Sequence, residues 1–176
     1  MSLLAKLFGV PLSSTTISTA STTGVARVLG IVSCDRPLFA PYTGRPCVYW
    51  RLEIRQQKFK DSFLFHRAVA CDFALLDKTG RAMVSGGACT YDVVANFVEM
   101  ERASSLSVKA REVARAHGVR LGEIAQVEVC EAVVVVGDQI EVEGRAMREG
   151  TNLTFAGGRV IGLARDAVML RRGHDY

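Results

Sequence analysis

Hydrophobic and polar residues alternate along much of the chain, and this period of two is typical of β-strands that bury one face. The alternation is clearest in residues 47–59. One face of that segment is apolar and consists of Val48, Trp50, Leu52 and Ile54. The opposite face is mostly polar and consists of Tyr49, Arg51, Glu53 and Arg55. We therefore predict a half-buried strand here.

Further strands are predicted from short apolar, β-branched runs: residues 24–33, 68–77, 81–94, 126–136 and 139–149. The segment from Asp77 to Gly80 reads as a hairpin turn between two of these strands, and Gly137-Asp138 as the turn of a later hairpin. Residues 59–67 are predicted to be a connection or a strand edge, and residues 159–172 a last strand or strand pair.

The period changes to that of a helix in residues 104–117. Apolar side chains recur there at helical spacing, with basic and acidic residues on the other side. Ser104 or Ser105 is suited to cap the start of this helix, and Gly118 to end it.

This order of elements predicts a mostly β fold, an OB-like small barrel of five or more strands with one α-helix before the last hairpin. A small β-sandwich with one helix would give nearly the same order. Residues 12–23 are rich in Ser and Thr and have the composition of a flexible linker, so the domain is predicted to span residues 24–172. Residues 1–23 then form a short amphipathic segment with its linker, and residues 173–176 a tail.

Composition, net charge and cysteine spacing disfavour several classes of function. The chain has 176 residues, 49% of them hydrophobic, and a net charge of +4, which is less basic than dedicated nucleic-acid binders usually are. No apolar run is long enough for a transmembrane helix. The five cysteines include no CxxC pair, so no metal site is expected. Cys34 and Cys47 flank a Pro-rich loop and could approach each other, but we expect reduced thiols.

The first residues carry one possible contact with a membrane. Leu4, Leu7 and Phe8 fall on one helical face, with Lys6 opposite. They predict either a loosely packed terminus or a short helix that touches a membrane or a partner through residues 1–11.

No nucleotide-binding, metalloprotease or nucleophile-elbow motif is present in the sequence. We therefore expect no enzymatic activity and no cofactor. The expected function is a binding module whose residues lie on the loop from Arg36 to Arg45 and on the polar face of the strand that follows. The candidate binding residues are Tyr42, Arg45, Tyr49, Arg51 and Arg55.

Single-stranded nucleic acid is the alternative ligand, because OB barrels stack bases on aromatic rings that lie beside cations. Tyr42 and Tyr49 with Arg51 and Arg55 offer such a combination. A protein partner that uses an edge strand is the other possibility.

Three short motifs resemble the GIDE-type domains, also called "beside a membrane" domains. The first is the strand and AP-x-[ST]-G loop with Gly30, Ala40, Pro41, Thr43, Gly44, Cys47 and Arg51. The second is the turn from Asp77 to Gly80. The third is the late hairpin with Glu131, Gly137, Asp138, Val142, Gly144 and Ala146. The resemblance spans roughly residues 24–147.

This resemblance implies a non-catalytic interaction module near a membrane. The transmembrane helices and the RING domain of family members are missing from this sequence, so ligase activity is not implied. We accordingly expect a protein adaptor that is cytoplasmic, with peripheral contact to a membrane, and consider nucleic acid the less favoured partner.

Overall fold

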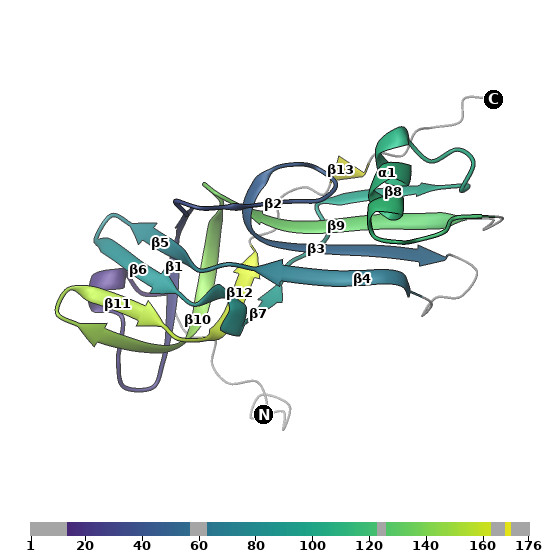
Figure 1. Cartoon of the computed structure of the whole chain (residues 1–176). Helices are drawn as coiled ribbons and strands as arrows, with labels where there is room; N and C mark the ends of the chain where they lie inside the picture. Colours follow the sequence, from purple (N-terminus) through teal and green to yellow (C-terminus); the bar gives the residue numbers. More distant parts are fainter. Residues whose placement is uncertain (1–13, 57–62, 123–125, 163–167, 170–176) are drawn as a thin grey trace, which may run out of the picture.

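The computed structural model describes residues 14–56, 63–122, 126–162 and 168–169. They form a mostly β protein with a closed barrel at one end and a second sheet at the other (Figure 1). One α-helix is present in this part of the chain.

The barrel is a ring of five strands: β1 (Val25–Ser33), β5 (Phe73–Asp77), β6 (Gly80–Val84), β11 (Asn152–Phe155) and β10 (Gln139–Glu149). The ring closes because β10 also pairs with β1. All pairs are antiparallel except β6 with β11, which is parallel. The predicted OB-like barrel is therefore confirmed. Strands β12 (Gly158–Gly162) and β7 (Cys89–Asp92) extend this sheet beyond β10.

The second sheet is built mostly from segments inserted between the barrel strands; only its edge strand β13 follows them in the chain. Its order is β13 (Val168–Met169), β8 (Phe97–Glu101), β9 (Val127–Val135) and β3 (Pro46–Gln56). The other side of β3 pairs with β2 (Leu38–Phe39) near its start and with β4 (Phe63–Ala70) along the rest. The region predicted as a connection or strand edge thus holds the first part of β4, which continues to Ala70.

The helix α1 (Val108–Ala116) covers one face of the second sheet. Its buried residues Ala110, Val113 and Ala114 belong to the same apolar cluster as Leu52 and Val129. The helix starts later than predicted because the hydroxyl of Ser107, not of Ser104 or Ser105, accepts a hydrogen bond from the backbone N–H of Ala110 at 3.1 Å. The barrel encloses its own core, which includes Val28, Phe73, Leu75, Ile140 and Phe155.

The Ser/Thr-rich segment is part of the fold from Ser14 onward, so the predicted boundary at Gly24 is wrong. Ile17, in the short 3-10 helix Ile17–Thr19, is 1% exposed and packs in the barrel core. Its backbone N–H donates to the carboxylate of Asp77 at 2.8 Å. The composition resembled a linker, but one apolar residue and one turn carboxylate hold the segment on the barrel.

The chain turns at Gly137-Asp138 as predicted, and Gly137 has a φ of 90° there. The two flanking strands, however, do not form the predicted hairpin. Strand β9 pairs with β3 and β8 in the second sheet, whereas β10 pairs with barrel strands and β12. The turn is therefore one of the places where the chain crosses between the two sheets.

Candidate functional site

The structure separates the five predicted binding residues. Tyr42 and Arg45 lie on the loop between β2 and β3, and Arg45 is exposed. Tyr49, Arg51 and Arg55 lie on β3. Tyr42 belongs to the face that carries α1, because its hydroxyl lies 3.3 Å from that of Ser107 at the start of the helix. Arg51 and Arg55 lie on the opposite face.

A buried carboxylate holds the loop from Ala40 to Arg45. Glu131 on β9 is fully buried, and its two oxygens accept the backbone N–H groups of Tyr42 at 2.6 Å and Thr43 at 3.0 Å. The loop also closes on itself, because the N–H of Gly44 donates to the carbonyl of Ala40 at 2.9 Å. Two of the three quoted motifs thus meet in space, although they are far apart in the sequence.

The side chain of Tyr42 is fixed in the same network. Its hydroxyl donates to Glu99 at 2.6 Å, and its ring stacks on Phe97 with centroids 4.1 Å apart. Burial, with a smaller contribution from Glu99, raises the pKa of Tyr42 to about 12. The phenol is therefore a neutral hydrogen-bond donor inside the protein, and its ring is not free to stack on a ligand.

Tyr49 was predicted on an outer face, and this prediction is wrong. The side chain is only 5% exposed and stacks on Tyr91 of β7 with ring centroids 3.9 Å apart. The pairing of β3 with β9 shifts register between Cys47 and Tyr49, and both Val48 and Tyr49 pack in the barrel core. A bulge of this kind interrupts the alternation from which the outer face was predicted.

Arg51 and Arg55 lie as predicted on the face away from the helix, but both are paired with Glu53. The Nε of Arg51 lies 3.1 Å from the Glu53 carboxylate, and Arg55 forms a second ion pair with it. The His66 ring on β4 lies 3.8 Å from the same carboxylate. Glu53 is buried, so it neutralises much of the positive charge of the two arginines where they lie.

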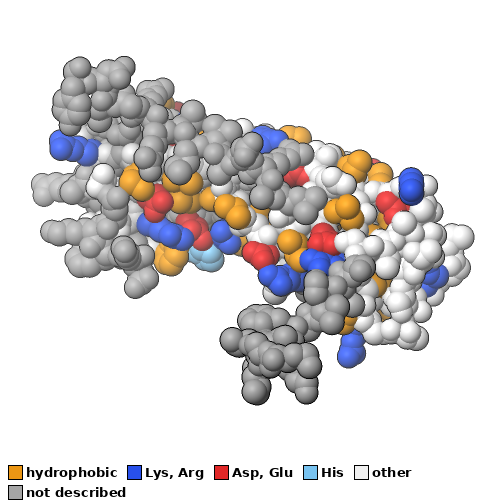
Figure 2. Space-filling view, turned by 180° about the vertical axis from the view of Figure 1, so that it is seen from behind, with side chains coloured by type: hydrophobic (Ala, Val, Ile, Leu, Met, Phe, Trp, Pro, Cys, Tyr) orange, Lys and Arg blue, Asp and Glu red, His pale blue; other side chains and the backbone are white. Residues whose placement is uncertain are grey.

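Apolar side chains surround this charged cluster. Register places Val98 and Met100 of β8 on the same face as Glu53 and Arg55, through their neighbours on β9. Met100 is 43% exposed and Phe63 of β4 is 49% exposed. In the view from behind, basic, acidic and hydrophobic side chains lie side by side over this sheet (Figure 2).

We call this region the open face, and define it by Arg51, Glu53, Arg55, Phe63, His66, Val98 and Met100. No described element packs over it as α1 packs over the other face. Strand β4 borders it, and among the described strands β4 pairs only with β3, so its second edge has no partner strand there. Arginine, methionine and aromatic residues are enriched in protein–protein interfaces.

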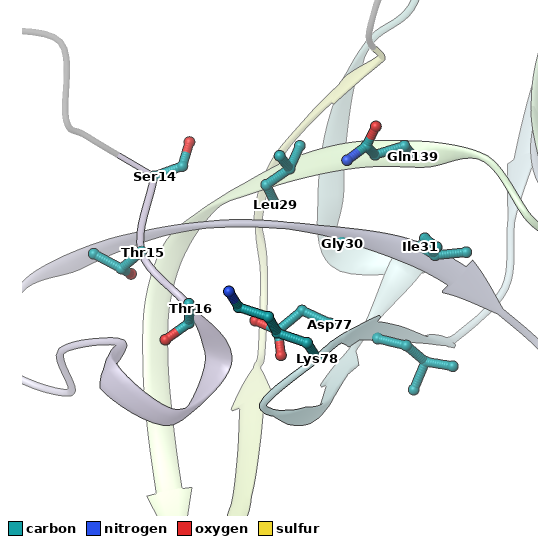
Figure 3. Close-up of a pocket in the computed structure, with 10 residues that line it drawn as sticks. Ser14, Thr15, Thr16, Leu29, Gly30, Ile31, Asp77, Lys78 and Gln139 are labelled. Atoms are coloured by element: carbon teal, nitrogen blue, oxygen red, sulfur yellow. The ribbon is translucent and has the colours of Figure 1, made fainter.

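A shallow hollow of about 430 Å³ lies on the barrel, beside β1 and the turn between β5 and β6 (Figure 3). Lys78 reaches towards it from the turn, and the hydroxyl residues Ser14, Thr15 and Thr16 form one wall. The carboxylate of Asp77 is occupied by the N–H groups of Ile17, Thr79 and Gly80. The hollow is open, and its one acidic group is already used by the fold.

The sequence did not predict the clamp, by which we mean the two hydrogen bonds that Glu131 accepts from the loop. Glu131 was noted only as part of a motif, without a partner. The available signal was a lone carboxylate inside the apolar run of residues 126–136, since a charge in such a run requires buried hydrogen-bond donors. Which donors they are depends on the fold.

All five cysteines are free thiols. Burial raises the pKa of Cys47 and of Cys130 to about 12, so neither is a ready nucleophile. In the described part of the chain no three His, Cys, Asp or Glu side chains gather into a group able to hold a metal ion. Nor does any helix there have the length and apolar character needed to cross a membrane.

These features define a class: an OB-like barrel with an inserted second sheet, one face of which is covered by a helix while the other presents a mixed polar and apolar surface. The chain matches no family model, and no curated protein or solved structure matches it significantly.

Proposed function

We propose that this protein is a non-catalytic binding module that recruits a protein partner through the open face. The supporting observation is the contrast between the two faces of the second sheet. One face is sealed by α1, while the other carries Met100 and Phe63, exposed at 43% and 49%, around the Arg51–Glu53–Arg55 cluster. An exposed patch that combines apolar side chains with arginines can supply both burial and orientation to a partner.

Single-stranded nucleic acid is less well supported as the ligand. Stacking needs an exposed aromatic ring beside an unpaired cation. Tyr49 and Tyr42 both have their rings stacked on other aromatic residues of the protein, and Arg51 and Arg55 share the Glu53 carboxylate. The two tyrosine rings on which the nucleic-acid alternative was based are therefore already occupied by contacts within the protein.

The site of action near a membrane rests on the resemblance to GIDE-type domains, and we retain it as part of the proposal. The residues expected to touch the membrane, Leu4, Leu7 and Phe8, lie outside the described residues. Flotation of the full chain with vesicles of phosphatidylcholine and phosphatidylserine tests this part. Binding that is lost when the three residues become Ser supports it, and binding that persists contradicts it.

The exposed methionines provide the test of the partner site. Met100 lies on the open face, whereas Met147 (58% exposed) lies on β10 and Met83 (38% exposed) on β6. The full chain is immobilised and incubated with nuclease-treated cell extract, and captured proteins are quantified by mass spectrometry. We expect Met100→Glu to reduce capture of the specific partner at least about ten-fold, since a charge buried at an interface centre costs several kcal/mol.

Met147→Glu is the matched control and should leave capture unchanged. Brief oxidation with dilute peroxide gives a second readout, in which bound partner protects Met100 but not Met83 or Met147. Equal capture by the wild type and Met100→Glu contradicts the proposal. Binding of a labelled single-stranded oligonucleotide that weakens with salt would favour the nucleic-acid function instead.

A further inference from the structure

Two cysteines lie where the chain leaves the barrel and returns to it. Cys34 follows the last residue of β1, and Cys71 stands between β4 and β5. The described strands between them, β2, β3 and β4, all belong to the second sheet. The pair therefore lies at the base of a large insertion, where a covalent link would join its two ends.

The two thiols are neighbours in the structure. Both line an open hollow of about 370 Å³. The Cys34 thiol donates to the carbonyl of Asp72, the residue after Cys71, at 3.6 Å. Burial, together with the neighbouring Cys34, raises the pKa of the Cys71 thiol. The sequence had suggested Cys47 as the neighbour of Cys34, but Cys47 is fully buried.

The remaining cysteines are less suited to exchange with a reagent from solution. Cys47 and Cys130 are 0% and 8% exposed. Cys89 is half-buried, and its thiol donates to the carbonyl of Ser85 at 3.4 Å. Only Cys34 and Cys71 combine access from an open hollow with a second thiol as a direct neighbour.

Charged side chains of both signs surround the hollow. Arg36 and Arg81 line it, together with Asp35 and Asp72. One carboxylate oxygen of Asp72 already accepts the N–H of Gly86 at 3.0 Å. A small disulfide that bears carboxylates, such as oxidised glutathione, can therefore meet two guanidinium groups as it approaches the thiols.

We propose that Cys34 and Cys71 form a reversible redox site, which a low-molecular-weight disulfide of the glutathione type oxidises to an intramolecular disulfide. This proposal is independent of the binding function proposed for the open face. The product would tie the end of β1 to the start of β5 and so fasten the base of the insertion.

The reaction is a thiol–disulfide exchange in two steps. Cys34, as the thiolate, attacks one sulfur of oxidised glutathione, which forms a mixed disulfide and releases one reduced glutathione. Cys71 then loses its proton and attacks the Cys34 sulfur, which forms the Cys34–Cys71 bond and releases the second glutathione. The protein loses two hydrogens, and the disulfide reagent is reduced to two thiols that gain them.

The test uses the full chain under native conditions with oxidised glutathione as the probe. Intact-mass measurement should show the loss of two hydrogens without a stable glutathione adduct, and peptide mapping should locate the bond between Cys34 and Cys71. Dithiothreitol should reverse the change. Fluorescence of the single tryptophan, Trp50, checks that the protein stays folded throughout.

Variants make the assignment specific. Cys71→Ser should stop the reaction at a glutathione adduct on Cys34, while Cys34→Ser should abolish the internal disulfide. Cys89→Ser is the matched control and should react like the wild type. A persistent glutathione adduct in the wild type, a disulfide between Cys71 and Cys89, or no reaction at all would each overturn the proposal.

Discussion

The barrel and the second sheet bury their strands in different ways. The five barrel strands close into a ring, so every one of them has a neighbour on both sides. The second sheet stays open: α1 covers one of its faces, while among the described elements none covers the other, and β4 leaves an edge unpaired. A closed barrel removes the exposed edges through which strands associate, and an open sheet keeps them.

This difference shows in which side chains each region buries and which it exposes. Large barrel side chains such as Phe73 and Phe155 are buried together in the core of the ring. The second sheet instead exposes Phe63 and Met100 on the open face. A loss of side-chain volume should therefore affect stability in the barrel core, and mainly surface properties on the open face of the second sheet.

The largest expected effect is a difference in the loss of stability between substitutions of two phenylalanines, one in the barrel and one on the open face. Phe155 is fully buried and lies opposite Ala146 on β10 and Val84 on β6. Phe155→Ala should lower the free energy of unfolding by about 3–5 kcal/mol because it leaves a cavity. Phe63→Ala should cost less than about 1 kcal/mol, since Phe63 is half exposed. Urea unfolding followed by Trp50 fluorescence measures both, and similar losses would contradict the contrast between the regions.

The next effect concerns two adjacent glycines at the junction of the two regions. A Cβ on Gly86 would lie 2.0 Å from the carbonyl oxygen of Cys71, whereas a Cβ on Gly87 meets nothing within 4 Å. Gly86→Ala should lower the free energy of unfolding by about 3 kcal/mol, because the backbone at Gly86 or at Cys71 must move to relieve the clash. Gly87→Ala should be neutral or stabilising by about 0.5 kcal/mol. Thermal unfolding of the two variants checks this prediction. A loss of stability in Gly87→Ala would show that the space around the Cβ does not explain the difference between the two positions.

A smaller effect is expected from the clamp on the loop. Glu131→Gln replaces one acceptor oxygen with a donor that faces a backbone N–H, so it should cost about 2 kcal/mol. Hydrogen exchange at the amides of Tyr42 and Thr43 should accelerate. Glu128→Gln, on the same strand but on the other face, should change stability by less than about 0.5 kcal/mol. Unchanged exchange in Glu131→Gln would mean that the loop is held by other contacts.

The smallest effect concerns the N-terminal segment on the barrel. Burial opposes ionisation of Asp77, but hydrogen bonds from Thr79, Ile17 and Gly80 outweigh it and lower the pKa of Asp77. The carboxylate therefore stabilises the fold fully above its ordinary pKa of 3.8, and this stabilisation is lost as the pH falls through the lower folded-state pKa.

Asp77→Asn should lower the free energy of unfolding by about 1 kcal/mol at neutral pH. The difference from the wild type should become smaller as the pH is lowered. Asp35→Asn, at an exposed position, should change the free energy of unfolding by less than about 0.5 kcal/mol. Urea unfolding between pH 7 and pH 2 measures the difference. A deficit for Asp77→Asn that stays constant with pH would contradict the assignment.

Part of the fold was predictable from local patterns. The turn at Asp77 forms because its carboxylate accepts the N–H groups of Thr79 and Gly80, which is a contact within four residues. The position of the helix followed from its apolar spacing, although the capping residue depended on Glu99, which accepts the N–H of Ser107. Local signals sufficed where the partners are close in sequence.

The candidate site was predictable only in part. Arg51 and Arg55 were correctly placed on one face of a strand, because alternation decides which side chains share a face. Their shared partner Glu53 was visible on the same face, but its neighbour His66 comes from another strand. Met100, Phe63, and the pair of Cys34 with Cys71 are joined only by strand pairing and by the course of the chain.

The sequence by itself determined that this chain is mostly β, that a helix precedes the turn at Gly137-Asp138, and where its tight turns lie, because these depend on interactions over a few residues. Only the tertiary structure decided that β9 and β10 belong to different sheets, that Tyr49 is buried against Tyr91, and that Glu131 holds the loop at Tyr42. The physical reason is that alternation gives a strand two faces but does not say what covers each of them. That is decided by the elements that pack there, whose residues are distant in the sequence.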